Sequence, residues 1–140
     1  MKRVSFPVAK ALKEAGYPQT LEEGYDEGYA ITKVRYKQYD RFDATWYTYI
    51  AQPETDLIFS NEYHYPENCG EFCVSPICLE VWLWLWQEKD IQITRGIDFC
   101  CIWIPDEKGN YVSKATIKKD DPEDAIIASI EYLVTNKLLK

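Results

Sequence analysis

The sequence predicts an α+β fold, with an antiparallel sheet of four to five strands and two to three helices packed mainly on one face of the sheet. Stretches with the helical spacing of apolar residues lie at the start, in the middle and at the end of the chain, and strand-like stretches separated by turn formers lie between them. The order helix, hairpin, helix, hairpin, helix favours antiparallel pairing of neighbouring strands. With 140 residues, 46% of them hydrophobic, the chain has the size of a single domain spanning residues 1–140.

The first predicted helix follows Ser5, a residue type that caps helices, and ends at Gly16, which is suited to a left-handed conformation. Between these two residues, Val8, Leu12 and Ala15 form one apolar stripe. The helix is about three turns long.

Two strands are predicted after an acidic stretch, residues 21–29, that we expect to be a loop or an irregular edge. Residues 30–39 alternate as a half-exposed strand does. Residues 45–50 are rich in aromatic and β-branched side chains and form the second strand, with a turn at residues 41–44. In the segment 51–74 we expect only a short strand near residues 57–59.

The central helix is predicted over residues 75–89, opened by Ser75 and Pro76, and it carries three tryptophans at every second position. In such a helix two sides are apolar, and one small core does not easily cover both. A central place in the core, a self-associating surface and a stacking pocket are the three interpretations of this pattern. The interface residues predicted for the second are Leu79, Trp82, Leu83 and Trp86.

The last third of the chain predicts a hairpin and a helix. After an extended segment at residues 91–94, strands at 97–104 and 111–117 are joined by the turn formers of PDEKGN. Asp121 then caps the final helix, and Pro122 fits its first position.

Charge and cysteine content exclude several classes of protein. The formal charge of −7 opposes non-specific attraction to DNA, RNA or anionic lipid, so we expect no nucleic-acid partner and no membrane partner. The chain shows neither a secretory signal nor a run of roughly 18 apolar residues, which predicts a cytoplasmic protein. Its five cysteines are an odd number, and reduced, mostly buried thiols are the simplest interpretation.

Three segments, VSFPVAKALKEAGY, SPICLEVWLWLWQEKDIQI and PEDAIIASIEYLVTNKLL, resemble a group of small α+β proteins of gut bacteria and their phages. Trp84-Leu85 followed by Glu88-Lys89 matches the middle element of that group. The chain departs from the pattern by extra length between Asp26 and Phe72 and by its additional tryptophans. The resemblance implies an α+β fold and a mobile-element origin, and it implies no activity and no site residues.

A basic strand face is the candidate ligand site. Lys33, Arg35 and Lys37 share one face of the predicted strand, and Arg41 follows in the turn. Basic side chains bind phosphate, and tyrosines such as Tyr47 and Tyr49 stack on bases. The alternative is a solvated sheet face whose lysines discourage edge-to-edge pairing.

Metal and catalytic sites are poorly supported by the sequence. Cys69, Cys73, Cys78 and His64 lie close together in sequence, but no Cys-x-x-Cys pair is present, so we expect no metal. With a single histidine and no glycine-rich phosphate loop, we expect no cofactor and lean against an enzyme. A hydrolase using a cysteine or a carboxylate is the remaining catalytic alternative.

These patterns favour a non-enzymatic binding protein that forms a homo-oligomer. The preferred interpretation is a phage-type accessory or anti-defence protein that sequesters a small nucleotide-like host molecule on Lys33, Arg35, Lys37 and Arg41. The alternative is a protein–protein inhibitor or adaptor that docks on a host protein through the tryptophan-rich helix.

Overall fold

The structure is a computed structural model, and it describes residues 2–19, 27–39, 42, 45–54, 57–59, 63–64 and 70–139. The elements in chain order are α1 (Phe6–Glu14), β1 (Glu27–Ala30), β2 (Val34–Tyr39), β3 (Trp46–Ala51), β4 (Leu57–Phe59), β5 (Tyr63–His64), β6 (Phe72–Ser75), α2 (Cys78–Lys89), β7 (Gln92–Arg95), β8 (Phe99–Pro105), β9 (Tyr111–Lys118) and α3 (Pro122–Thr135). The α+β class is confirmed. None of the helices in the described part of the chain is both long and apolar enough to cross a membrane.

The predicted single sheet of four to five strands is not confirmed. The described strands form three antiparallel sheets of three strands each, in the orders β4-β1-β6, β3-β2-β5 and β7-β8-β9. By their contacts, residues 5–76 and residues 1–4 with 77–140 form two compact units. The expectation of one domain stays a prediction, because compactness alone does not decide whether each unit folds by itself.

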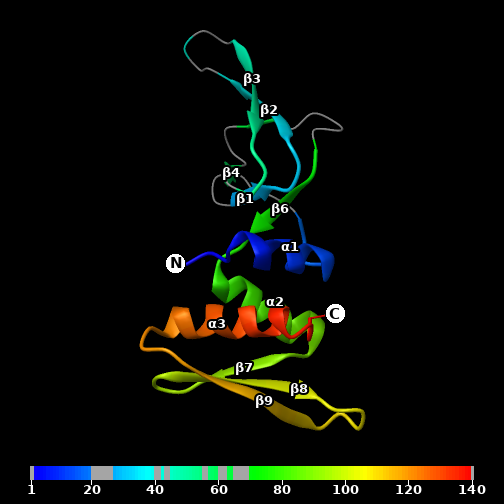
Figure 1. Cartoon of the computed structure of the whole chain (residues 1–140), viewed down its shortest axis with the longest axis vertical. Coiled ribbons are helices and arrows are strands. Elements are labelled where there is room, and N and C mark those ends of the chain that lie inside the picture. The colour runs from blue at the N-terminus through cyan, green and yellow to red at the C-terminus, as the bar shows by residue number, and fades with distance from the viewer. Residues whose placement is uncertain are drawn as a thin grey trace. The chain divides into compact units, whose positions relative to one another are not determined.

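In the unit that contains the C-terminal half, α2 and α3 cover one face of the β7-β8-β9 meander (Figure 1). Both predicted strands of the hairpin are confirmed, with a bulge in the pairing between Ile102 and Trp103. The core of this unit is built from fully buried aliphatic side chains of α2, β7, β8 and α3, and it includes Val81, Leu85, Ile93, Ile102, Ile126, Ile130 and Leu133.

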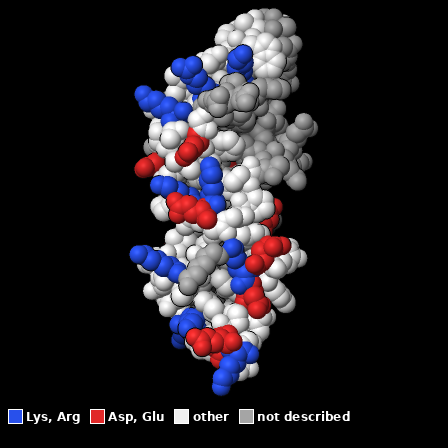
Figure 2. Space-filling model, turned by 90° about the vertical axis from the view of Figure 1, so that its right-hand side faces the viewer, with Lys and Arg blue, Asp and Glu red and all other residues white. Residues whose placement is uncertain are grey.

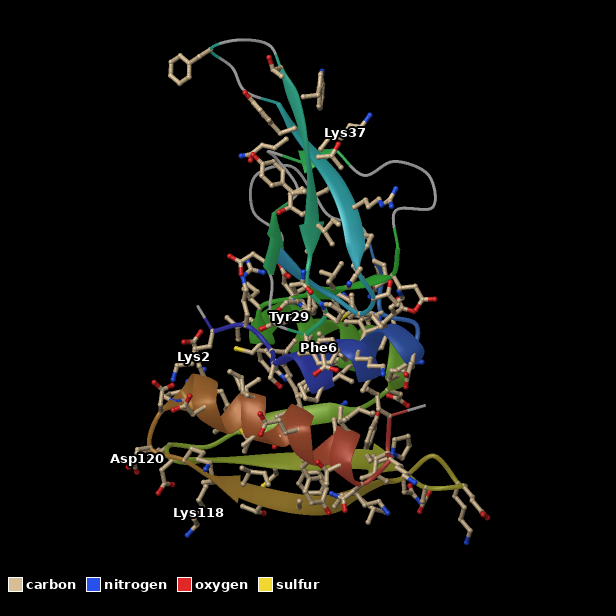
Figure 3. The ribbon with its side chains drawn as sticks, turned by 45° about the horizontal axis from the view of Figure 1, so that its top comes forward. Lys2, Phe6, Tyr29, Lys37, Lys118 and Asp120 are labelled. Atoms are coloured by element: carbon tan, nitrogen blue, oxygen red, sulfur yellow. The ribbon has the colours of Figure 1, made fainter. Side chains whose placement is uncertain are left out.

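The start of α3 is capped as the sequence predicts. The carboxylate of Asp121 accepts hydrogen bonds from the backbone N–H groups of Glu123 and Asp124, and these bonds lower the pKa of Asp121. Lys2 forms ion pairs with Asp121, at 3.6 Å, and with Asp124. Figure 3 shows the Lys2 side chain beside the first turn of α3. The N-terminal residues are thereby tied to this unit.

In the other unit, α1 packs on β6. The Lys13 ammonium donates a hydrogen bond of 2.7 Å to the carbonyl of Phe72. The ring of Phe6 meets the ring of Tyr29 edge to face, with 5.8 Å between the centroids (Figure 3). The predicted helix is confirmed, and Gly16 follows it at φ +96°.

The predicted strand over residues 30–39 is wrong at its beginning, because the chain bends at residues 31–33. The backbone N–H groups of Ile31 and Thr32 donate to the carbonyl of Glu71, and the Thr32 hydroxyl accepts from the Glu71 N–H. These bonds remove the segment from the strand ladder. A separate strand, β1, therefore ends at Ala30, and the stretch 21–29 is not wholly a loop.

The beginning of the central helix also differs from the prediction. Ser75 is the last residue of β6 and is fully buried, and α2 begins at Cys78 after Ile77. The pairing of β1 with β6, in which Glu27 lies opposite Ser75, outweighs the tendency of Ser75 to cap a helix.

Candidate functional site

The β2–β3 hairpin carries the candidate ligand residues, and its register decides which of them share a face. Arg35 lies opposite Ile50, and Lys37 lies opposite Thr48. Directly opposed residues of antiparallel strands project to the same side of the sheet. Arg35 and Lys37 therefore share a face with Trp46, Thr48 and Ile50 of β3, and we call this set the basic face.

The basic side chains of this face reach into solvent. Arg35 and Lys37 are exposed, and Figure 3 shows the Lys37 side chain extending away from β2. Figure 2 shows a group of Lys and Arg side chains over the part of the molecule that holds β2 and β3 in Figure 1. Lys33 is also exposed and lies just before β2, whereas Arg41 lies outside the described residues.

The two predicted tyrosines lie on the other face of the hairpin. Tyr49 lies opposite Tyr36 and stacks on it, with 5.5 Å between the ring centroids. Tyr47 is tilted against Tyr49 at 6.5 Å. Tyr36 packs on the core cluster of Ala30, Val34 and Ala51. This face of the hairpin is therefore the one that contacts the interior of the unit. The structure does not bring Tyr47 and Tyr49 together with Arg35 and Lys37.

Trp46 is an aromatic residue on the basic face, and the sequence interpretation missed it. Its side chain is 48% exposed. The signal was present in the predicted turn at residues 41–44. A turn centred between residues 42 and 43 places each odd-numbered residue of the first strand opposite an even-numbered residue of the second. Counting across the turn would have matched Lys37 with Thr48 and placed Trp46 beside them.

The tryptophan helix α2 is buried on one side only. Val81 and Leu85 are fully buried. Trp82 is half-buried, and its indole N–H donates a hydrogen bond of 2.8 Å to the carbonyl of Ile93 in β7. Trp84 is half-buried as well, and the ammonium of Lys89 lies 5.4 Å from its ring centroid.

The predicted interface residues of α2 divide into two groups. Leu83 and Trp86 are 53% and 55% exposed. Leu79 is half-buried, and Trp82 is anchored to β7 by its hydrogen bond. Only Leu83 and Trp86 therefore offer a large exposed apolar surface on this helix.

Cys73, Cys78 and Cys100 lie in the interior, whereas Cys101 is half-buried. Burial raises the pKa of the Cys73, Cys78 and Cys100 thiols above the ordinary value, which disfavours the nucleophilic thiolate. Among the residues whose side chains are described, no three His, Cys, Asp or Glu side chains are placed to hold a metal ion. Of the residues in the zinc alternative, Cys69 and the side chain of His64 fall outside the described part.

No family model, no curated protein and no solved structure matches this chain.

Proposed function

We propose that this protein acts by binding, and that the basic face of the β2–β3 hairpin holds an anionic, nucleotide-like molecule. The observation that carries the proposal is the register that places Trp46 on the same face as Arg35 and Lys37. A guanidinium and an ammonium bind phosphate oxygens, and an indole stacks on a base. Trp46 is a diagonal neighbour of Lys37, and Arg35 lies two residues from Lys37 along β2, so the proposed ligand reaches from the indole past the ammonium to the guanidinium.

The charge pattern supports the same ligand class. The chain carries a formal charge of −7, yet neither β2 nor β3 contains an Asp or a Glu. A local basic face on an acidic protein attracts a small anion, whereas the acidic remainder repels the long polyanion of a nucleic acid. This pattern therefore favours a small molecule with few phosphates.

Binding is favoured over catalysis by the state of the cysteines. A hydrolase that used Cys73 or Cys78 would need an accessible thiolate, and burial of both thiols works against one. The resemblance to proteins of phages adds the proposal that the bound molecule belongs to a bacterial host. Sequestering it would make the protein a phage-type anti-defence factor.

The proposal is tested by calorimetry against a panel of nucleotides. We expect the double substitution Arg35→Glu and Lys37→Glu to weaken binding at least about tenfold, because it replaces two charge-assisted contacts with repulsion. The matched control is Lys114→Glu with Lys118→Glu, which makes the same charge change on exposed residues of β9 and should leave the affinity unchanged. Absence of heat with every nucleotide, or equal losses in both variants, would contradict the proposal.

The role of Trp46 is measured in the same titrations. Trp46→Ala removes the stacking partner but leaves the cations in place, so nucleotide binding should weaken and pyrophosphate binding should not. If Trp46→Ala changes the affinities for the nucleotide and for pyrophosphate equally, the proposed stacking of Trp46 on the base is contradicted.

A second candidate function is docking on another protein through α2. It is favoured by the exposure of Leu83 and Trp86, because large exposed apolar side chains mark interaction sites. A host protein retained stoichiometrically on the immobilised chain should be lost on Trp86→Ala and kept on Glu88→Ala, an exposed polar position of the same helix. A partner that survives Trp86→Ala would place the docking surface elsewhere.

A further inference from the structure

Among the strands that the structure describes, β3 is the outermost strand on one side of its sheet. In the order β3-β2-β5, the pairing found among the described strands joins β3 to β2 alone. Edge strands invite pairing with another strand, and proteins commonly block them with charged side chains. The edge strand β9 carries Lys114 and Lys118, whereas β3 carries no charged residue from Trp46 to Ala51.

The sequence of β3 is close to symmetric about its centre. Thr48 lies between Tyr47 and Tyr49, and the next pair outward is Trp46 and Ile50. Two such strands that run antiparallel about a two-fold axis would each present the same pattern to the other. Isologous interfaces require this kind of self-complementarity.

We propose that β3 pairs with β3 of a second copy of this chain, about a two-fold axis at Thr48, to form a continuous six-stranded sheet. In this register Trp46 lies opposite Ile50 of the partner, and Thr48 lies opposite Thr48 of the partner. On the other face, Tyr47 lies opposite Tyr49 of the partner. These are aromatic with β-branched, Thr with Thr, and aromatic with aromatic pairs, which are the combinations that stabilise antiparallel sheets.

Other registers give poorer pairs. A shift of one residue places the tyrosines of one copy opposite Trp46, Thr48 or Ile50 of the other. The basic faces of the two hairpins would then lie on opposite sides of the joint sheet. A shift of two residues leaves one of the large outer side chains without a counterpart. The register about Thr48 is therefore the one that matches all five positions.

The exposed area fits a weak dimer. Trp46, Tyr47, Tyr49 and Ile50 are between 40% and 52% exposed. With roughly 150–250 Å² for each aromatic side chain, the four together expose about 350 Å² per copy. Even complete burial would give about 700 Å² for the pair, which is below the roughly 1,200 Å² of a standard stable interface. We therefore expect a concentration-dependent dimer with a dissociation constant in the micromolar range or weaker.

The dimer would also double the candidate ligand site. A two-fold axis perpendicular to the sheet keeps both basic faces on the same side. The two β2 strands would lie three strand spacings apart, about 14 Å, with the paired β3 strands and both Trp46 side chains between them. This consequence rests on the proposed function, whereas the pairing of β3 does not, so the assembly test below succeeds or fails independently of nucleotide binding.

The test is a charge exchange at the two-fold axis, read by sedimentation equilibrium. In the proposed register residue 48 faces itself, so Thr48→Lys alone and Thr48→Glu alone should each weaken dimerisation at least about tenfold. An equimolar mixture of the two variants should restore the dimer, because Lys then lies opposite Glu. Ser113→Lys, on the exposed edge strand β9, is the control and should dimerise as the wild-type chain does.

Three results would overturn the proposal. They are a wild-type chain that stays monomeric up to roughly 1 mM, single variants that dimerise like the wild type, and a mixture of folded variants that stays monomeric. Amide hydrogen exchange on the wild-type chain gives a second readout that needs no variant. The amides of β3 should gain protection as concentration rises while those of β9 do not, and equal behaviour of both strands would also overturn the pairing.

Discussion

Leu85→Ala should lower the free energy of unfolding by about 2–5 kcal/mol, which is the range for removing a buried leucine side chain and leaving a cavity. Leu85 is fully buried in α2, which packs on α3 and β7. The matched control is Leu83→Ala, two positions earlier on the same helix and 53% exposed. We expect that substitution to change stability by less than about 1 kcal/mol.

Urea denaturation followed by circular dichroism measures both values. The comparison holds residue type, helix and helix propensity constant, so the difference reports burial alone. Equal losses for Leu83→Ala and Leu85→Ala would show that the Leu83 side of α2 is also covered in solution. That outcome would support an interface on α2 and contradict its exposure in the single chain.

Gly70→Ala should destabilise the protein about as much as Leu85→Ala, with an expected decrease of roughly 3 kcal/mol in the free energy of unfolding. Gly70 has φ +121°, a backbone region that is essentially restricted to glycine and costs other residues about 1–3 kcal/mol. An added Cβ would also lie 2.5 Å from the Lys33 carbonyl oxygen and 3.2 Å from Cα of Val34. Both of these atoms belong to the backbone, and they cannot move without disturbing the start of β2.

Gly16→Ala is the control for the contribution of the backbone dihedral. Gly16 has φ +96°, and a Cβ added there would meet no heavy atom within 4 Å. We expect this substitution to cost only about 1 kcal/mol. The difference between the two alanine variants, measured by denaturant titration, isolates the close approach of Gly70 to residues 33 and 34. If the two losses are the same, the close approach of Gly70 to residues 33 and 34 does not limit the side chain at position 70.

Local signals in the sequence predicted most of the elements. The cap at Asp121 and the glycine after α1 are confirmed, because a short polar side chain and a missing Cβ act within one helical turn. The hairpin around PDEKGN is confirmed for the same reason, with strands on both sides of the turn. Alternation also predicted that Arg35 and Lys37 share one exposed face of β2.

The elements that differ from the prediction are those whose hydrogen bonds join segments far apart in the sequence. The partners of β1 are β4 and β6, which both lie beyond the whole β2–β3 hairpin, and no local pattern indicates that choice. This pairing places Ser75 in a strand and delays α2 to Cys78. The bonds from residues 31 and 32 to Glu71 likewise divide the strands into separate sheets.

The sequence by itself determined the α+β class, the type of most elements and which residues of β2 are basic, because side-chain periodicity and caps act over a few residues. Only the tertiary structure decided that β1 pairs with β4 and β6, and that Ser75 therefore lies in a strand and not in the central helix. It also decided that Leu85 is buried and Leu83 exposed. The physical reason is that register and burial depend on which surfaces meet, and those contacts join residues far apart in the chain.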